Sequence, residues 1–210
     1  MRLIESVHGG YVHRRRTSVL SGLCSKFIAA NSTVLDVGCG DGWLARLIAD
    51  KRPDISIQGI DIQLRKDAAI PVELFDGKTI PYNDSSFDIV MFVDVLHHTR
   101  EPMMLLREAV RVARQAILIK DHVVEGTFAH SRLRFMDWVG NARHGVALPY
   151  NYWTLAKWHG AFDELGLGIN SRESNLRLYP FPADLVFGGS LHFIALLDVP
   201  RGEEKPDAQR

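Results

Sequence analysis

The chain has 210 residues, and its 25 basic and 25 acidic side chains give a formal net charge of zero. Hydrophobic residues make up 46% and charged residues 24%, which is typical of a folded domain and excludes a strongly basic nucleic-acid binder and an acidic disordered chain. A chain of this length buries roughly 70% of its unfolded surface on folding, enough for one sizeable core. We therefore expect a single domain over residues 1–200 and a flexible polar tail at residues 201–210.

Only two cysteines are present, Cys24 and Cys39, which are too few for a disulfide scaffold or a closed zinc site. No bound metal is expected on this ground. The first residues lack the apolar stretch of a signal peptide, and no run approaches the roughly 20 apolar residues that span a bilayer. We expect a cytoplasmic protein without a membrane span, and the neutral charge argues against a nucleic-acid partner.

The first half of the chain alternates between helical and strand-like patterns. Apolar residues at i, i+3, i+7 and i+8 from Leu20 predict an N-terminal helix over about residues 15–29. Helical faces are also expected near residues 43–48 and 102–110. Short apolar runs predict strands at residues 34–37, 55–60, 72–75, 89–93 and 116–119. Strands alternating with helices at this spacing predict a mostly parallel, doubly wound α/β sheet with helices on both faces.

The second half of the chain departs from this pattern. Residues 121–153 carry no strand signal and are expected to form a partly helical insertion that lies as a cap over the mouth of the sheet. A helix is expected at residues 155–165, and strands at residues 171–178 and 191–197. Because no helix is predicted between these two strands, we expect them to pair antiparallel at the sheet edge.

The most informative stretch is residues 34–43, VLDVGCGDGW, where the first strand meets the following helix. Gly38, Gly40 and Gly42 let the backbone turn sharply and approach a ligand, and the helix after them offers unpaired amides. Asp61 follows the second strand, where a carboxylate can accept hydrogen bonds from two ribose hydroxyls. The layout predicts a nucleotide or nucleoside site at this edge of the sheet.

Two classes of cofactor use such a layout. A dinucleotide fingerprint requires G-x-G-x-x-G, but Trp43 occupies the position of the third glycine. Asp36 lies two residues before the glycines, where its charge would repel a pyrophosphate and would suit a cationic group such as an ammonium. These residues favour a nucleoside that carries positive charge, and they argue against a nicotinamide oxidoreductase.

The motifs resemble those of the class I S-adenosylmethionine-dependent methyltransferases, of the small-molecule "type 11" kind. VLDVGCGDG is similar to the first motif of that family, DGKTIPY at residues 76–82 to its acidic third-strand loop, and SFDIV with VLHH at residues 86–98 to its fourth-strand motif. The resemblance covers roughly residues 33–120 in detail. It implies a Rossmann-like sheet of seven strands, mostly parallel, with the last strand antiparallel.

The resemblance also implies a site for S-adenosylmethionine, with S-adenosylhomocysteine as the product. It assigns the methionine part to Asp36 and the glycine turn, the ribose to Asp61 and the adenine edge to Asp76. The expected cofactor residues are Asp36, Gly38, Cys39, Gly40, Asp61, Ile62, Asp76, Gly77, Asp94 and Tyr11. Tyr11 belongs to an N-terminal arm at residues 1–30, whose basic segment 13–16 either closes over the cofactor or stays solvated.

A hydroxyl acceptor of the methyl group needs a base, for which histidine is suited near neutral pH. The candidates follow the fourth and fifth strands, whose carboxyl ends form the ligand-binding edge of such sheets, or lie in the insertion. They are His122, Asp121, His98, His97 and His144. For His97 and His98, a packing role at the start of a helix is the alternative.

Two features of the insertion bear on the acceptor. Three arginines, Arg132, Arg134 and Arg143, would favour an anionic group. A set of aromatic residues would either line an aromatic pocket or pack the insertion onto the sheet, namely Trp138, Tyr150, Tyr152, Trp153 and Trp158. The sequence VDVL at residues 93–96 lacks the Asn/Asp-Pro-Pro-aromatic motif of nucleobase methyltransferases. We therefore predict an enzyme that methylates a small molecule; the alternative is a non-catalytic regulatory module that binds the same cofactor.

Overall fold

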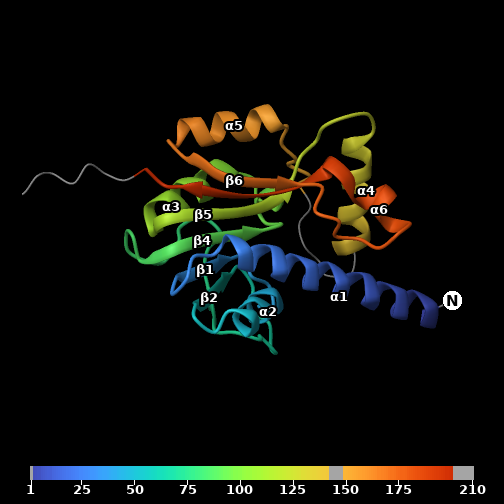
Figure 1. Ribbon diagram of the computed structural model, residues 1–210, viewed down its shortest axis with the longest axis horizontal. Helices are drawn as coiled ribbons and strands as arrows, with labels where there is room; N and C mark the ends of the chain where they lie inside the picture. Colours follow the sequence, from blue (N-terminus) through green and yellow to red (C-terminus); the bar gives the residue numbers. More distant parts are fainter. Residues whose placement is uncertain (1, 142–148, 201–210) are drawn as a thin grey trace, which may run out of the picture.

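The computed structural model describes residues 2–141 and 149–200, with the helical backbone alone for residues 2–13 and 139–141. The strands in chain order are β1 (Thr33–Val37), β2 (Ser56–Asp61), β3 (Val72–Leu74), β4 (Phe87–Val93), β5 (Ala113–His122), β6 (Gly168–Ser174) and β7 (His192–Asp198). They form one sheet in the order β3-β2-β1-β4-β5-β7-β6 (Figure 1). Only β7 is reversed, since it runs antiparallel to both β5 and β6 while the other neighbours are parallel. The predicted seven-stranded, mostly parallel sheet with an antiparallel last strand is confirmed.

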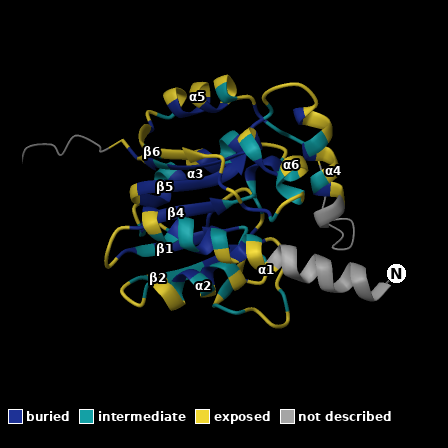
Figure 2. Cartoon of the chain, turned by 45° about the vertical axis from the view of Figure 1, so that its right-hand side comes forward, coloured by how far each residue is buried: buried dark blue, intermediate teal, exposed yellow. Residues whose placement is uncertain are grey.

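Helices cover both faces of this sheet, as expected. They are α1 (Arg2–Phe27), α2 (Trp43–Lys51), α3 (Pro102–Val112), α4 (Ala129–Asn141), α5 (Leu155–Glu164) and α6 (Ala183–Phe187), with short 3-10 turns η1 (Leu96–His98) and η2 (Gly189–Leu191). One buried cluster joins the sheet to α3 and α5, and a second joins its other face to α1 and α2. The sheet is therefore sandwiched between two layers of helices, and its central strands β4 and β5 are largely buried (Figure 2).

The residues of β4 show why both faces are covered. Val90 and Phe92 belong to the cluster with α3 and α5, and Ile89 and Met91 to the cluster with α1 and α2. Successive side chains of a strand point to opposite faces, so an unbroken apolar run demands burial on both sides. The same alternation places Asp36 of β1 on the face covered by α1 and α2, because its neighbours Leu35 and Val37 lie in the other cluster.

The expected extent of the fifth strand is wrong at its carboxyl end. The prediction stopped at Ile119 and gave Asp121 and His122 to the insertion, but β5 continues to His122. Lys120, Asp121 and His122 are polar, which hides the strand in the sequence. They pair in register with residues 192–194 of β7 and are buried by this pairing. The insertion therefore begins after His122.

Two other boundaries differ from the prediction. The N-terminal helix spans Arg2–Phe27 and not residues 15–29. The sequence does not indicate its first part, because Gly9 and Gly10 each disfavour a helix by about 1 kcal/mol relative to alanine. The edge strand β6 covers Gly168–Ser174 and not residues 171–178, because an exposed edge strand has little hydrophobic alternation to locate it. A short helix, α6, also lies between β6 and β7, where none was expected.

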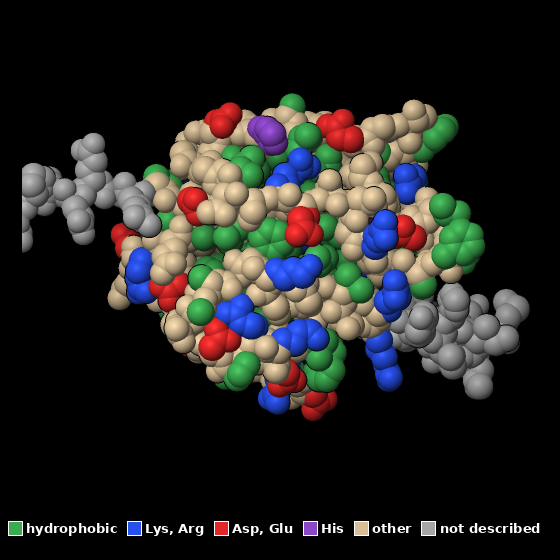
Figure 3. Space-filling view, viewed as in Figure 1, with side chains coloured by type: hydrophobic (Ala, Val, Ile, Leu, Met, Phe, Trp, Pro, Cys, Tyr) green, Lys and Arg blue, Asp and Glu red, His purple; other side chains and the backbone are tan. Residues whose placement is uncertain are grey.

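The helices α4 and α6 lie together at the end of the molecule from which the start of α1 extends (Figure 1). Hydrophobic side chains gather on this end of the surface (Figure 3). The exposed large hydrophobic residues in α4, in α6 and just before these helices are Phe128, Phe135, Trp138, Phe181, Leu185 and Val186. Among the described residues no helix is both long and apolar enough to cross a membrane. The tail predicted at residues 201–210 lies outside the described residues.

Candidate functional site

The glycine turn after β1 is tied to the neighbouring strands on both sides. The amides of Gly38 and Cys39 both donate to the Ile60 carbonyl oxygen in β2, at 2.8 and 3.2 Å. Gly38 has a φ of +74°, and a Cβ at this position would lie 2.7 Å from a methyl carbon of Val95, which follows β4. The turn therefore requires glycine here for backbone conformation and for space.

Asp61, the last residue of β2, braces this turn. One oxygen of its carboxylate accepts a hydrogen bond from the Gly40 amide at 2.8 Å, and the other accepts from the Gln63 amide at 3.0 Å. The side chain is buried. The two strand ends and the glycine turn thus form one connected rim.

The loop after β3 extends the rim beyond Asp61. Ile62 is 67% exposed, although it is a large apolar residue, and a Cβ at Gly77 would lie 3.1 Å from it. The preceding residue, Asp76, is exposed, and one of its oxygens accepts hydrogen bonds from the amides of Lys78 and Thr79. An apolar platform and a carboxylate therefore lie next to each other on this part of the rim.

Asp36 is the least satisfied charged group of the rim. The residue is buried on the α1 face of β1, with 3% of its surface exposed, and no hydrogen bond to its carboxyl group comes from the residues that the structure describes. Burial, together with the charge of Asp61, raises the pKa of Asp36 to about 7. A buried carboxylate without a donor or counter-ion is costly, so this group favours a cationic ligand or a proton.

A second polar cluster lies at the carboxyl ends of β4 and β5. Asp94 follows β4 and has a φ of +57°, a conformation that aspartate tolerates better than most residues. Its carboxylate accepts from the guanidinium of Arg16 in α1 and from the ammonium of Lys120 in β5. Burial would raise the pKa of Asp94, but Lys120 and Arg16 hold it well below its ordinary value. The ammonium of Lys120 also contacts Nδ1 of His192 at 3.2 Å.

His97 joins two carboxylates from different parts of the fold. Its Nδ1 lies 2.6 Å from Oδ1 of Asp121 in β5, and its Nε2 lies 3.6 Å from Oδ2 of Asp137 in α4. Burial alone would lower the pKa of His97, but the two carboxylates raise it to about 10. His97 is therefore an imidazolium near neutral pH, and its Nδ1–H donates to Asp121. Tyr152 donates to Asp137 from the other side.

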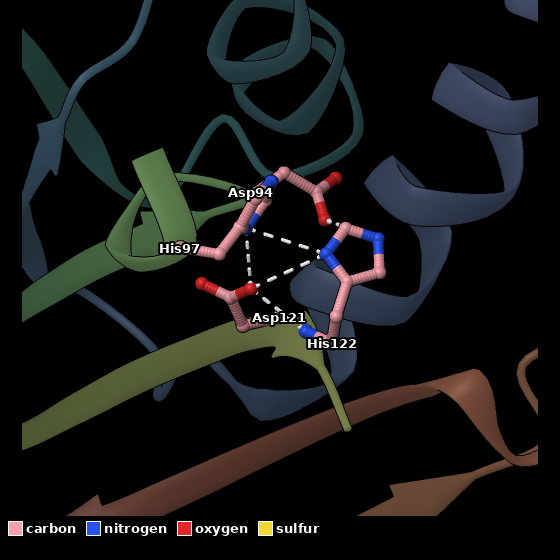
Figure 4. Close-up of side chains that lie close together, drawn as sticks. All are labelled: Asp94, His97, Asp121 and His122. Carbon is pink, nitrogen blue, oxygen red and sulfur yellow. Dashed lines mark hydrogen bonds and ion pairs between the residues drawn. The ribbon is translucent and has the colours of Figure 1, made fainter. Parts of the chain in front are cut away.

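His122 completes this cluster (Figure 4). Its Nδ1 lies 3.3 Å from Nδ1 of His97 and 3.4 Å from Oδ1 of Asp121, while its Nε2 lies 3.7 Å from Oδ1 of Asp94. Burial, followed by the charges of His97 and Lys120, lowers the pKa of His122. The imidazole of His122 is therefore neutral when His97 is charged.

The other histidines of this edge are also neutral. Burial and the neighbouring charge of His97 lower the pKa of His98 to about 4, and burial and Lys120 lower that of His192 well below its ordinary value. Nε2 of His192 lies 2.7 Å from the Phe187 carbonyl oxygen and must donate to it, so Nδ1 accepts from Lys120. Nδ1 of His98 is buried and has no hydrogen-bond partner among the described residues.

The structure brings the predicted site residues into two adjoining groups. The first contains Asp36, Gly38, Cys39, Gly40, Asp61, Ile62, Asp76 and Gly77. The second contains Asp94, His97, His98, Asp121 and His122. The side chain of Tyr11 and all of Arg143 and His144 lie outside the described residues.

The arginines predicted to attract an anionic acceptor make contacts outside these two groups, whereas the indole of Trp158 donates to the His122 carbonyl oxygen at 3.0 Å. Arg132 donates to the carbonyl oxygens of residues 185, 186 and 188, so its guanidinium holds α6 against α4. The guanidinium of Arg134 lies 4.7 Å from the ring centre of Tyr150. Trp153 and Trp158 are buried in the main core, which fits the packing alternative for both.

Three residues that contact the second group were not singled out as site residues in the sequence: Lys120, Asp137 and His192. Arg16, which pairs with Asp94, belongs to the basic segment 13–16 that was expected either to close over the cofactor or to stay solvated. Lys120 offers a usable signal, because a lysine inside the apolar run AILIK is unusual in a buried strand. Asp137 and His192 come from α4 and β7 and meet the cluster only through the tertiary fold, so no local pattern marks them.

A separate hollow of about 690 Å³ opens between α3 and the segment before α5. Its walls include Arg107 and Glu108 of α3 and Trp153 and Lys157 near α5. None of the predicted cofactor-binding or catalytic residues lines it, although Trp153 is one of the aromatic residues considered for an acceptor pocket. We identify the functional site by its chemistry at the rim and not by the depth of this hollow.

Comparison with known proteins agrees with this fold. The chain has the fold of the class I S-adenosylmethionine-dependent methyltransferases, as the sequence predicted. The family model described as "Methionine biosynthesis protein MetW" matches residues 21–166, which is well over half of the chain. The protein therefore belongs to the MetW family.

The curated relatives match a smaller part of the chain than the family model does. The chain is 29% identical over 133 residues to 27-O-demethylrifamycin SV methyltransferase of Amycolatopsis mediterranei (strain S699), which covers 52% of this chain and 48% of that protein. It is 30% identical over 105 residues to ajmaline N-methyltransferase of Rauvolfia serpentina, a match that covers 43% of this chain and 36% of that protein. The matches thus span less than half of the length of these relatives.

Solved structures show the same fold. The crystal structure of the [4+2]-cyclase SpnF has a TM-score of 0.66 and 18% identity, covering 88% of this chain and 81% of that one. A methyltransferase from Aquifex aeolicus, described as SAM dependent, has a TM-score of 0.55 and 18% identity, covering 85% and 88%. Since one of these neighbours is described as a cyclase, the fold alone does not fix the reaction.

Proposed function

We propose that the protein is an enzyme that uses S-adenosylmethionine to methylate a small molecule. The observation that carries this proposal is Asp36, a buried carboxylate with no hydrogen-bond donor among the described residues. It lies beside the glycine turn, and its neighbour Asp61 is a second carboxylate. A ligand that brings positive charge to this point relieves the cost of burying Asp36, whereas phosphates would increase it.

The other rim residues fit the same cofactor part by part. We assign the ammonium of the cofactor to Asp36, the ribose hydroxyls to Asp61, and the adenine to the exposed face of Ile62 and the carboxylate of Asp76. Gly38, Cys39, Gly40 and Gly77 allow close approach of the backbone, and Asp94 and Tyr11 complete the proposed set. The bound cofactor supplies a methyl group that is already activated by the adjacent positive charge.

We place the acceptor on the β4–β5 side of the rim. The predicted catalytic residues His97, His98, Asp121 and His122 all lie there, next to the residues proposed for the cofactor. Their task in this proposal is to orient the acceptor and to exclude water, which can contribute several kcal/mol to catalysis. The names of the rifamycin and ajmaline relatives describe small-molecule methyltransferases, which supports an acceptor of this class.

Thermal unfolding with added ligands tests the proposed cofactor. S-adenosylhomocysteine is expected to raise the melting temperature, because it binds only the folded chain, and NAD is expected to leave it unchanged. Asp61→Ala should weaken S-adenosylhomocysteine binding by a few kcal/mol at most. Because this change also removes the acceptor of the Gly40 and Gln63 amides, circular dichroism is used to check that the variant is folded. Arg107→Gln, at an exposed residue of α3 that pairs with Glu164, is the control. Stabilisation by NAD, or unchanged S-adenosylhomocysteine affinity in Asp61→Ala, would contradict the assignment.

A further inference from the structure

The histidine–aspartate cluster at the ends of β4 and β5 contains three ligand-type atoms that converge. Nδ1 of His97, Nδ1 of His122 and Oδ1 of Asp121 are separated by 2.6, 3.3 and 3.4 Å. All three side chains are at least 97% buried. Figure 4 shows the two imidazoles and the carboxylate turned toward one another from η1 and β5.

We propose that His97, His122 and Asp121 form a binding site for a divalent transition-metal ion. Two imidazoles and one carboxylate are a donor set that such ions use when further coordination positions stay open. Ligands about 2.0–2.2 Å from a metal lie roughly 3–3.5 Å from one another, and two of the three separations already match this. The third, between His97 and Asp121, must lengthen by a few tenths of an ångström when an ion replaces the shared proton.

The groups behind the histidines provide a second, independent observation. A metal-bound histidine usually donates its distal N–H to a carboxylate, which fixes the ring. Here each distal Nε2 faces a carboxylate oxygen: that of His97 lies 3.6 Å from Asp137, and that of His122 lies 3.7 Å from Asp94. Among the described residues, neither of these buried Nε2 atoms has a hydrogen-bond partner. Binding through Nδ1 leaves the proton of each ring on Nε2, where these carboxylates can accept it.

The metal-binding carboxylate is also oriented in advance. Oδ2 of Asp121 accepts from the Leu96 amide at 3.1 Å, and Oδ1 accepts from the His122 amide at 2.7 Å. The charges of Arg16 and Lys120 are directed to Asp94, which lies beyond His122. The cluster therefore keeps one negative ligand and two imidazoles for the ion, and the carboxylate of Asp94 offsets one of the two nearby positive charges.

The ion would lie on the side of the rim where we place the acceptor, and its open positions suit an oxygen atom of that molecule. His97, Asp121 and His122 would then hold the acceptor through the ion and would not serve as bases. Binding of the ion does not depend on methyl transfer. The two proposals can therefore fail separately.

Metal titration of the full chain, stripped with a chelator and then titrated with Co²⁺ or Zn²⁺, tests this site. We expect one ion per chain, visible d–d absorption with Co²⁺, and X-ray absorption of the Zn²⁺ form with two nitrogen ligands at about 2.0–2.1 Å. Absence of stoichiometric binding in the wild-type chain overturns the proposal, whatever S-adenosylhomocysteine does.

Variants locate the ion. His97→Ala and His122→Ala should each lower Zn²⁺ affinity more than hundredfold, while His159→Ala, an exposed histidine of α5, should not change it. Asp137→Asn should weaken binding by about 10–100-fold, as expected for a residue that only orients a ligand. If His98→Ala abolishes binding, the ion uses the neighbouring group of His97, His98 and Asp137, and the assigned donor set is wrong. Circular dichroism of each variant excludes unfolding as the cause, and the X-ray absorption of the wild type remains decisive if a variant unfolds.

Discussion

The two parts of the sheet rim satisfy their charges in opposite ways. On the β1–β2 side, Asp36 is buried beside Asp61 without any hydrogen-bond donor among the described residues. On the β4–β5 side, Asp94 and Asp121 are held by cations, amides and a histidine. The difference supports the proposal that a ligand binds on the first side, whereas the side chains of the second side are held in position by one another.

Removing Asp121 is expected to have the largest effect on stability, because Asp121 is the acceptor of a buried hydrogen-bond network on the β4–β5 side. Asp121→Ala leaves the imidazolium of His97 and the amides of Leu96 and His122 without their acceptor in a buried site. The free energy of unfolding should fall by about 3–5 kcal/mol, as for other buried pairs that lose one partner. Urea denaturation at pH 7, with a chelator present, measures this. A loss below about 1 kcal/mol would show that the network contributes little.

Neutralising Asp36 should instead increase the free energy of unfolding. Folding raises the pKa of Asp36 from 3.8 to about 7, so its ionisation costs stability as the pH rises through this window. Asp36→Asn is expected to be more stable than the wild type at pH 8 by about 2–4 kcal/mol, and this advantage should shrink as the pH falls toward 4. Denaturation curves at several pH values give the comparison. A variant that is destabilised at pH 8 would mean that Asp36 already has a partner.

Alanine substitutions in the glycine turn test whether the close approach of Val95 to Gly38 on the β1–β2 side contributes to stability. Gly38→Ala should destabilise the fold by about 1–3 kcal/mol, since its Cβ meets Val95 at 2.7 Å and its φ is +74°. Gly40→Ala is the matched control, because its φ is +62° but a Cβ there meets nothing within 4 Å. The control should lose only about 1 kcal/mol. If thermal unfolding shows equal losses of stability for the two variants, the close approach of Val95 does not require glycine at position 38.

The smallest effect is expected for a charged pair far from both sides. Arg107 of α3 pairs with Glu164 of α5, and both side chains are more than half exposed. Arg107→Gln should change the free energy of unfolding by no more than about 0.5–1 kcal/mol, because water and salt screen such pairs. Urea denaturation at low and high salt measures it. A large loss would indicate that surface charge, and not the rim, dominates the electrostatics of this fold.

Much of the fold was predictable from the sequence for physical reasons. The apolar run of β4 must be buried on both faces, and the spacing of strands and helices leaves few alternatives to a doubly wound sheet. The end of β5 was not predictable, because Lys120, Asp121 and His122 are polar and their burial depends on β7, more than 70 residues later. Local periodicity carries no information about such a partner.

The two groups of site residues also differ in how far the sequence predicts them. The residues of the glycine turn and Asp61 are close in sequence to their strands, and the rule that ligands bind at the carboxyl ends of strands places them. Asp137 of α4 and Arg16 of α1 reach the second cluster only because helices pack over the sheet edge. Their roles require the packed structure, and a single sequence does not specify them.

The central claim is that Asp36 awaits a cationic ligand, and calorimetric titration with S-adenosylhomocysteine at pH 6 tests it most directly. With a pKa of about 7, Asp36 is mostly protonated at this pH, and a bound ammonium should drive its proton off. Measured in two buffers of different ionisation enthalpy, binding to the wild type should release about one proton, and binding to Asp36→Asn should release none. Binding without proton release in the wild type, or equal release in both proteins, would contradict the account.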